Sequence, residues 1–199
     1  MTLREILSQG MSPYPGDAAR APLSTLKSRL ELAATLSSTA LQLQNTPWLD
    51  SSWNSNDVLF HTGIAAHPYI AKFFDTDAGQ REGLEKIGEP TPVRNKTIFN
   101  LGVLLLEIFF RKSLDHFKTA EDSHIFTEFS IAKRLIESLA EEASSGYADA
   151  VTACIYGDFG RGVKDHNFDN DAFRQAVYDY VVTPLEEEWR HFNRMRLLE

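Results

Sequence analysis

The chain has 199 residues, which suits one domain of ordinary size, and 43% of them are hydrophobic, enough for a buried core. Its formal net charge is −8. Nucleic-acid binders and proteins on anionic membranes usually carry a basic face, so this acidic chain without a basic cluster is expected to bind neither. The lone cysteine, Cys154, excludes an internal disulfide and favours a reducing, cytoplasmic compartment. Because its neighbours are apolar, it is expected to be a buried structural thiol.

The N-terminal part of the chain is expected to be a leader, residues 1–24, ahead of a helical domain over residues 25–199. Its first ten residues include Arg4 and Glu5 and lack a long apolar stretch, which is unlike a signal peptide. Residues 10–25 are rich in proline and glycine, a composition typical of loops.

The first long helix is predicted over residues 26–44, because apolar and small side chains recur there at spacings of three and four. Ser24 is expected to cap its N-terminus, with Leu23 as the hydrophobic staple residue. The dipeptide Thr46-Pro47 ends the helix, since proline cannot continue it.

A small β-hairpin is predicted next, from residues 57–60 and 69–74, with Gly63 and Pro68 flanking the connection. One hairpin is only marginally stable in water, so it must pack on the helices. Residues 75–96 are polar and contain several glycines and prolines, which indicates an irregular segment.

The most apolar run, residues 98–110, is 13 residues long and therefore too short to cross a bilayer. It predicts a buried central helix over residues 97–110. Further helices are predicted at residues 125–143, at 147–156, and from Asn170 or Asp171 to Val182, with a kink or restart at Pro184. The expected fold is therefore mainly α, a helical bundle with one small hairpin.

Metal and cofactor motifs are weak in this chain. Asp165, Asn167 and Asp169 have the alternating spacing of a calcium loop, but Asn170 replaces its glycine and Ala176 its bidentate glutamate. We interpret this stretch as a polar loop whose Asp169 or Asn170 caps the next helix. No cofactor or metal is expected.

Other candidate motifs have structural interpretations. His61 and His67 flank a turn without a third ligand, so they are not expected to hold a metal. No glycine-rich phosphate loop is present. The letters Asp-Phe-Gly within residues 157–160 follow the central helix, whereas a kinase needs its metal-binding motif before that helix. We expect a helix-terminating loop there.

The partner of one glutamate and the role of two tryptophans stay open. Glu107 in the apolar helix needs a partner, for which Arg111 one turn on is the near candidate and Arg161 a distant one. Trp48 and Trp53 flank a polar turn, where they either anchor a partner or pack on the domain's own core.

Several segments resemble the C-terminal lobe of a protein kinase. Residues 30–43 resemble the long helix that leads into the catalytic loop, and the following spacing matches that loop without a gap. On this resemblance Ser52 stands where kinases have the catalytic aspartate. Asn54 stands for the loop lysine, and Asp57 for the metal-binding asparagine.

The resemblance continues beyond this loop. Residues 70–74 look like the strand entering the metal-binding motif, with Lys72 in place of its aspartate. Residues 101–107 look like the central hydrophobic helix, with Thr97 where an aspartate normally precedes it, and residues 150–155 resemble a later helix.

The whole pattern, over about residues 25–190, is similar to a fungal family of kinase-like domains of unknown function, including the segments 43–49 and 173–178. Membership would imply a fungal intracellular protein. The substituted catalytic and metal-binding positions argue against phosphoryl transfer. Only about 25 residues precede the first long helix, too few for a kinase N-lobe.

The expected function is therefore a catalytically inactive, kinase-like module that binds a protein partner. Possible partner contacts are Trp48, Trp53, Leu84 and Ile87, the last two being apolar residues in a polar segment at the place of a kinase activation segment. Two alternatives stay open: an enzyme of another class on the same scaffold, and a fragment whose N-lobe another chain supplies.

Overall fold

The structure is a computed structural model that describes residues 1–9, 23–60, 68–71, 92–122, 126–160 and 162–195. Some residues singled out in the sequence lie outside this described part: His61, His67, Lys72, Leu84, Ile87 and Arg161. The described part is mainly helical with one small antiparallel hairpin, which confirms the predicted fold class. None of its helices is long and apolar enough to cross a membrane.

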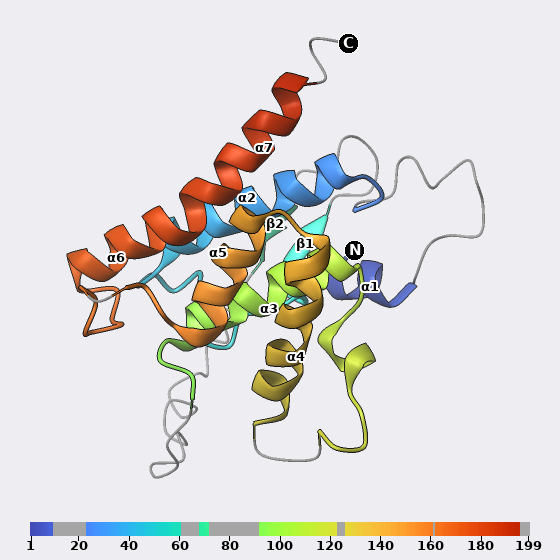
Figure 1. Cartoon of the computed structure of the whole chain (residues 1–199), viewed down its shortest axis with the longest axis horizontal. Coiled ribbons are helices and arrows are strands. Elements are labelled where there is room, and N and C mark those ends of the chain that lie inside the picture. Colours follow the sequence, from blue (N-terminus) through green and yellow to red (C-terminus); the bar gives the residue numbers. More distant parts are fainter. Residues whose placement is uncertain (10–22, 61–67, 72–91, 123–125, 161, 196–199) are drawn as a thin grey trace.

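The central helix is α3, Lys96–Phe110, which contacts α2, α4 and α5 (Figure 1). Its sequence is apolar nearly throughout, and most of its side chains are buried, including Leu104 and Leu105. The Asn95 side chain caps its N-terminus by accepting a hydrogen bond from the Ile98 N–H at 3.0 Å. The helix ends at Arg111, whose backbone is left-handed with φ 55°.

Helix α2, Leu26–Leu43, confirms the first predicted long helix. Its N-cap is Thr25 and not Ser24, because Thr25 and Ser28 form a reciprocal capping box, with the Ser28 N–H donating to Thr25 Oγ1 at 3.1 Å. Leu23 is buried as expected of a staple residue, but it lies two residues before the cap.

Helices α4 (Thr127–Glu142) and α5 (Ser145–Tyr156) pack against each other and against α3. A Cβ added at Gly102 of α3 would lie 2.8 Å from Cys154 Cβ and 2.8 Å from Ile155 Cδ1, so a glycine permits this close approach. Cys154 is buried as predicted, and burial raises the pKa of its thiol.

The segment after α5 begins at Gly157, which is left-handed with φ 61° and terminates that helix as predicted. Within it, Phe159 is buried and its ring packs edge-on against Phe173, with centroids 5.4 Å apart.

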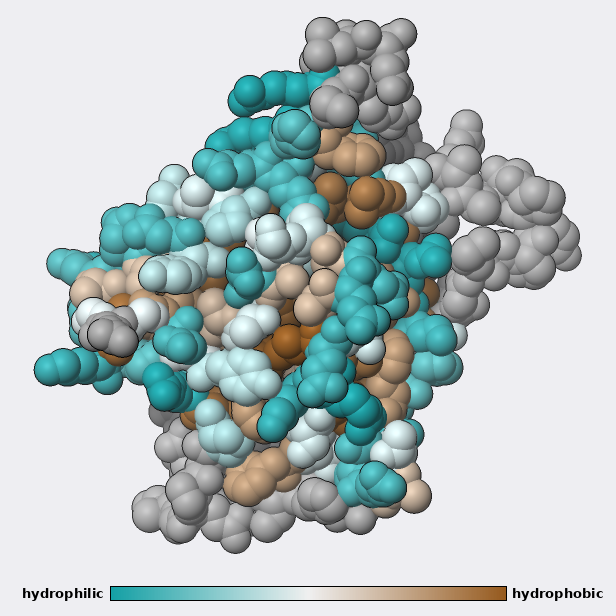
Figure 2. All heavy atoms as spheres, viewed as in Figure 1, coloured by the Kyte–Doolittle hydropathy of each residue, from teal (hydrophilic) through white to brown (hydrophobic). Residues whose placement is uncertain are grey.

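The C-terminal helices are α6 (Asp171–Val177) and α7 (Thr183–Met195), joined by a π-helical turn, Tyr178–Val182. The wider turn lies just before Pro184, whose ring would clash with the carbonyl four residues back in a regular helix, so the α-helix restarts there as predicted. Helix α7 packs along α2. Figure 2 shows that the viewed face is largely hydrophilic, with smaller apolar areas between.

The hairpin pairs β1 (Val58–Phe60) with β2 (Pro68–Ile70), so the second strand begins before the predicted Tyr69. On the other side of β1, the Phe60 N–H donates to the Met1 carbonyl at 2.8 Å. The N-terminal segment therefore extends the sheet edge, a contact that local sequence does not reveal.

Two short elements were not predicted: helix α1, Leu3–Gln9, and a 3₁₀ turn, Leu114–Phe117. Leu3 and Leu7 of α1 are buried in the same core as the other helices. The division between a leader and a domain at residues 24 and 25 stays a prediction.

Candidate functional site

The loop that follows α2 is held by the central helix. Asn100 Nδ2 donates to the Ser51 carbonyl at 3.0 Å and to the Trp53 carbonyl at 2.9 Å. The Trp53 indole in turn donates to the Thr97 carbonyl at 3.0 Å. Trp53 is only 3% exposed, so of the two alternatives for this tryptophan the structure shows packing on the domain's own core.

The predicted kinase-derived positions Ser52, Asn54 and Asp57 do come together on this loop, where they hydrogen-bond within the loop. The Ser52 hydroxyl donates to Asp50 Oδ1 at 2.7 Å, and Asp57 Oδ2 accepts from the Asn54 N–H at 2.8 Å. Together with Trp48, these residues line a hollow of about 100 Å³. Ligand pockets usually measure roughly 300–1,000 Å³, so this hollow does not have the size of a nucleotide site.

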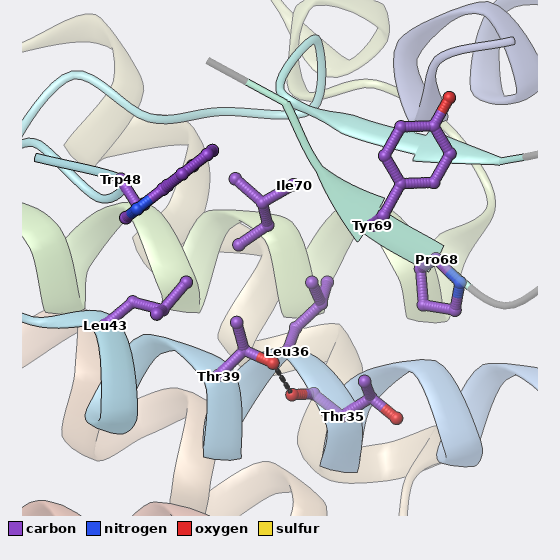
Figure 3. A pocket seen from close by; sticks show the side chains of 8 residues that line it. All are labelled: Thr35, Leu36, Thr39, Leu43, Trp48, Pro68, Tyr69 and Ile70. Carbon is purple, nitrogen blue, oxygen red and sulfur yellow. Dashed lines mark hydrogen bonds between the residues drawn. The ribbon is translucent and has the colours of Figure 1, made fainter.

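A larger and more apolar groove of about 250 Å³ lies between α2, the Trp48 turn and β2 (Figure 3). Leu36 is the buried residue of this groove, whereas Trp48 is 49% exposed and Tyr69 47% exposed. Its lining residues are Thr35, Leu36, Thr39, Leu43, Trp48, Pro68, Tyr69 and Ile70.

Local hydrogen bonds explain the apolar character of the groove. Thr35 and Thr39 donate their hydroxyls to carbonyls one turn back in α2, both at 2.7 Å, so their polar atoms are already satisfied. The turn that carries Trp48 is fixed because Thr46 donates its hydroxyl to the Leu43 carbonyl and accepts from the Trp48 N–H at 3.3 Å. The groove is therefore apolar. The two exposed aromatic side chains, Trp48 and Tyr69, flank it.

A second cleft, of about 410 Å³, lies beside α3, the 52–56 loop and the 3₁₀ turn. Its unusual feature is Glu107, which is 4% exposed. Glu107 Oε1 accepts from the Leu114 N–H at 2.8 Å, while its buried Oε2 has no hydrogen-bond partner. Burial raises the pKa of Glu107, while the Leu114 N–H and then Ser55 and Arg4 act in the opposite direction.

Of the two candidate partners of Glu107, Arg161 lies outside the described residues, and Arg111 is not among the groups that shift the pKa of the carboxyl group. Arg111 is the left-handed C-cap residue of α3. The backbone of Leu114 is a partner of the carboxylate. At the rim of this cleft, Arg4 pairs with Asp115 at 2.5 Å.

The calcium-like stretch is a set of local turns. Asp165 Oδ1 accepts from the Asn167 N–H at 3.0 Å, and Asn167 Oδ1 accepts from the Asp169 N–H at 3.1 Å. Asn170 caps α6, one of the two predicted capping residues. Among the described residues, no three His, Cys, Asp or Glu side chains are grouped so that they could hold a metal ion.

Comparison with known proteins shows to which family the chain belongs. The family model of a domain of unknown function, DUF7580, matches residues 1–192. The chain belongs to the DUF7580 family. The match runs from α1 into α7, so both the Trp48 groove and the Glu107 cleft lie within the DUF7580 region. No curated protein and no solved structure matches the chain.

The sequence predicted Trp48 as a contact but missed the rest of the groove. Leu36 lies 12 residues before Trp48, and Tyr69 lies 21 residues after it, so only the fold brings them together. A usable signal was present in Tyr69, a large aromatic on the solvent side of a short predicted strand.

Proposed function

We propose that this DUF7580 domain is a catalytically inactive, kinase-like module that binds a partner protein through the Trp48 groove. The observation that carries the proposal is the pair of exposed aromatic side chains, Trp48 and Tyr69, beside an apolar groove. Tryptophan and tyrosine are enriched among the few residues that dominate binding energy in protein interfaces. An intracellular, fungal setting is part of the same proposal and rests on the sequence resemblance.

The kinase-like part of the proposal is supported by the order of elements. A long helix, a polar loop, a hairpin and a central apolar helix follow one another as the resemblance predicts. The loop is also tied to the central helix through Asn100. Inactivity is supported because Asp57 accepts from the loop's own backbone at the position where a kinase binds metal.

The alternative is an enzyme of another class, for which the Glu107 cleft is the specific observation. A buried carboxylate with a raised pKa is a known mark of acid–base sites. Glu107 is only 4% exposed, however, so a substrate could not reach the carboxylate without movement of its neighbours. The groove is therefore favoured over the cleft.

Affinity capture with the tagged full chain tests the proposed function. Wild type is compared in cell lysate with Trp48→Ala and Tyr69→Ala. Tyr178→Ala is a matched control, because Tyr178 is a similarly exposed tyrosine, at 45%, outside the groove lining. A partner should be retained by wild type and the control. It should be weakened by about thirtyfold by the groove variants, the effect of truncating a residue worth about 2 kcal/mol.

Retention of the same partner by all variants would contradict the groove as the binding site. Thermal unfolding of each variant is recorded beside the capture. Because Trp48 and Tyr69 are about half exposed, their replacement should leave the melting temperature within a few degrees of wild type.

A further inference from the structure

The outer edge of β2 carries backbone groups that point away from β1. In the hairpin, Val58 faces Ile70 and Leu59 faces Tyr69. The Ala71 N–H donates to the Asp57 carbonyl at 3.1 Å, one position beyond the Val58–Ile70 pair. Bonded and non-bonded pairs alternate in an antiparallel ladder, so Val58–Ile70 is a non-bonded pair. The N–H and C=O of Ile70 therefore point outward.

The two edges of the hairpin differ. The outer edge of β1 is occupied by the N-terminus, where Phe60 and Met1 exchange backbone hydrogen bonds. Within the described part of the chain, no third strand pairs with β2. At one end of this edge stands Pro68, which has no N–H to donate. Ile70 therefore offers a donor and an acceptor together, and Pro68 offers a carbonyl only.

This open edge borders the Trp48 groove. The groove is lined by α2, the Trp48 turn and β2, and by no residue of β1, so it lies on the outer side of β2. Figure 3 shows the Ile70 side chain directed toward α2 and the Tyr69 ring directed away from it. A segment placed there would meet backbone groups on one side and apolar side chains of α2 on the other.

Carboxylates near the Trp48 end of the groove restrict the chemistry of the segment that could bind there. Trp48 also lines the adjoining hollow, which includes Asp50 and Asp57. Asp57 is a partly exposed residue that lines this hollow, and its Oδ2 accepts from the Asn54 N–H. The chain as a whole has a formal net charge of −8. A basic side chain at the Trp48 end would be electrostatically complementary to this region.

We propose that β2 accepts an extended segment of a partner protein as a third strand, paired through the backbone of Ile70. Alternate apolar side chains of the partner fill the Trp48 groove, and a lysine or arginine lies toward Asp57. Strand addition takes affinity from main-chain hydrogen bonds and specificity from pockets for alternate side chains. This inference rests on the proposed function of the groove and names the conformation of its partner.

A phage-displayed library of random twelve-residue peptides, selected on the full chain and counter-selected on Trp48→Ala, tests the sequence class. Enrichment of alternating apolar residues next to a lysine or arginine is the expected result. Enrichment of apolar residues at spacings of three and four would assign a helix to the groove and overturn the proposal. A library without any enriched peptide would also overturn it.

Amide exchange measured by ¹⁵N NMR with a synthetic copy of the selected peptide tests the pairing. The Ile70 N–H should exchange at least about tenfold more slowly in the complex, because it gains a hydrogen bond. The Tyr69 N–H, which already faces β1, is the internal control and should change little. Peptide binding that leaves Ile70 exchange unchanged would overturn strand addition.

Two variants at position 70 distinguish the contribution of the backbone hydrogen bond from that of the side chain. Ile70→Pro removes the outward N–H and keeps an apolar residue, whereas Ile70→Val keeps both. Because this N–H does not pair with β1, the hairpin can tolerate its loss, and a melting curve checks this. Affinity for the peptide should fall at least about tenfold more for proline than for valine. Equal losses would overturn the proposal.

Other occupants give different results. Slow Ile70 exchange in the dilute isolated chain would mean that the chain itself covers the edge. If exchange of the Ile70 N–H slows only at high protein concentration, a second copy of the chain covers the edge. Either result overturns the proposal. A captured partner that needs Trp48 and Tyr69 but leaves Ile70 exchange unchanged would overturn strand addition and keep the proposed interaction function.

Discussion

Glu107→Gln tests whether the buried carboxylate destabilises the fold at neutral pH. Burial raises the pKa of Glu107 in the folded chain above its ordinary value of 4.5, so the folded state binds this proton more tightly than the unfolded state. The resulting stabilisation is fully present below the unfolded pKa and is lost as pH rises through the raised folded pKa. Glutamine has the same shape and stays neutral throughout this range.

The size of the effect follows from the hydrogen bonds of the two carboxylate oxygens. Oε1 keeps an acceptor for the Leu114 N–H in the variant, while the unpartnered Oε2 is exchanged for a neutral NH₂ group. A buried polar group without a hydrogen bond costs about 1–3 kcal/mol, and a charged group costs more than the neutral NH₂ group that replaces it. Glu107→Gln should therefore be more stable than wild type by about 1–3 kcal/mol at pH 7, with little difference near pH 4.

Urea unfolding at a series of pH values from 4 to 8 measures this difference. Glu128→Gln is the matched control, because Glu128 lines the same cleft and its side chain is 66% exposed in a pair with Lys96. An exposed pair contributes about 0–1 kcal/mol, so the control should not gain stability with rising pH. A Glu107→Gln variant that is less stable than wild type at every pH would refute the reasoning.

Three further predictions concern the core and the loop. Leu105→Ala should cost about 2–5 kcal/mol in urea unfolding, since Leu105 is 0% exposed, and an unchanged midpoint would contradict its place in the core. Gly102→Ala should cost about 1–3 kcal/mol, because the new Cβ would meet Cys154 Cβ and Ile155 Cδ1 at 2.8 Å; a neutral effect would mean that α3 and α5 separate easily. Magnesium-ATP at millimolar concentration should not raise the melting temperature, and a shift of several degrees that Lys72→Ala abolishes would contradict catalytic inactivity.

The helices were predictable because their patterns are long. Helices α2 and α3 repeat apolar residues over several turns, and each carries a recognisable cap or stop in the sequence. Helix α1 was missed because it spans only seven residues, and its Leu3 and Leu7 become informative only when the core is present. The N-cap of α2 was misplaced by one residue, because Ser24 and Thr25 are both of a preferred capping type.

The candidate site was less predictable, because each of its features depends on distant contacts. Trp48 and Trp53 lie in the same turn, and composition does not distinguish them. Trp53 is buried because its indole reaches the Thr97 carbonyl, which lies 44 residues away in sequence. Glu107 was expected to pair one turn along its helix, but the helix ends at a left-handed residue and the following 3₁₀ turn supplies the donor.

Both polar side chains buried in α3 bind the backbone of a neighbouring loop. Asn100 holds the carbonyls of Ser51 and Trp53, and Glu107 holds the N–H of Leu114. A buried polar group is costly unless it is hydrogen-bonded, so each of these residues stabilises its loop only in one arrangement. The central helix thereby holds the loop that follows the Trp48 turn, and residues 52–56 of this loop also line the Glu107 cleft. Groove and cleft share no lining residue, so variants in one can serve as controls for variants in the other.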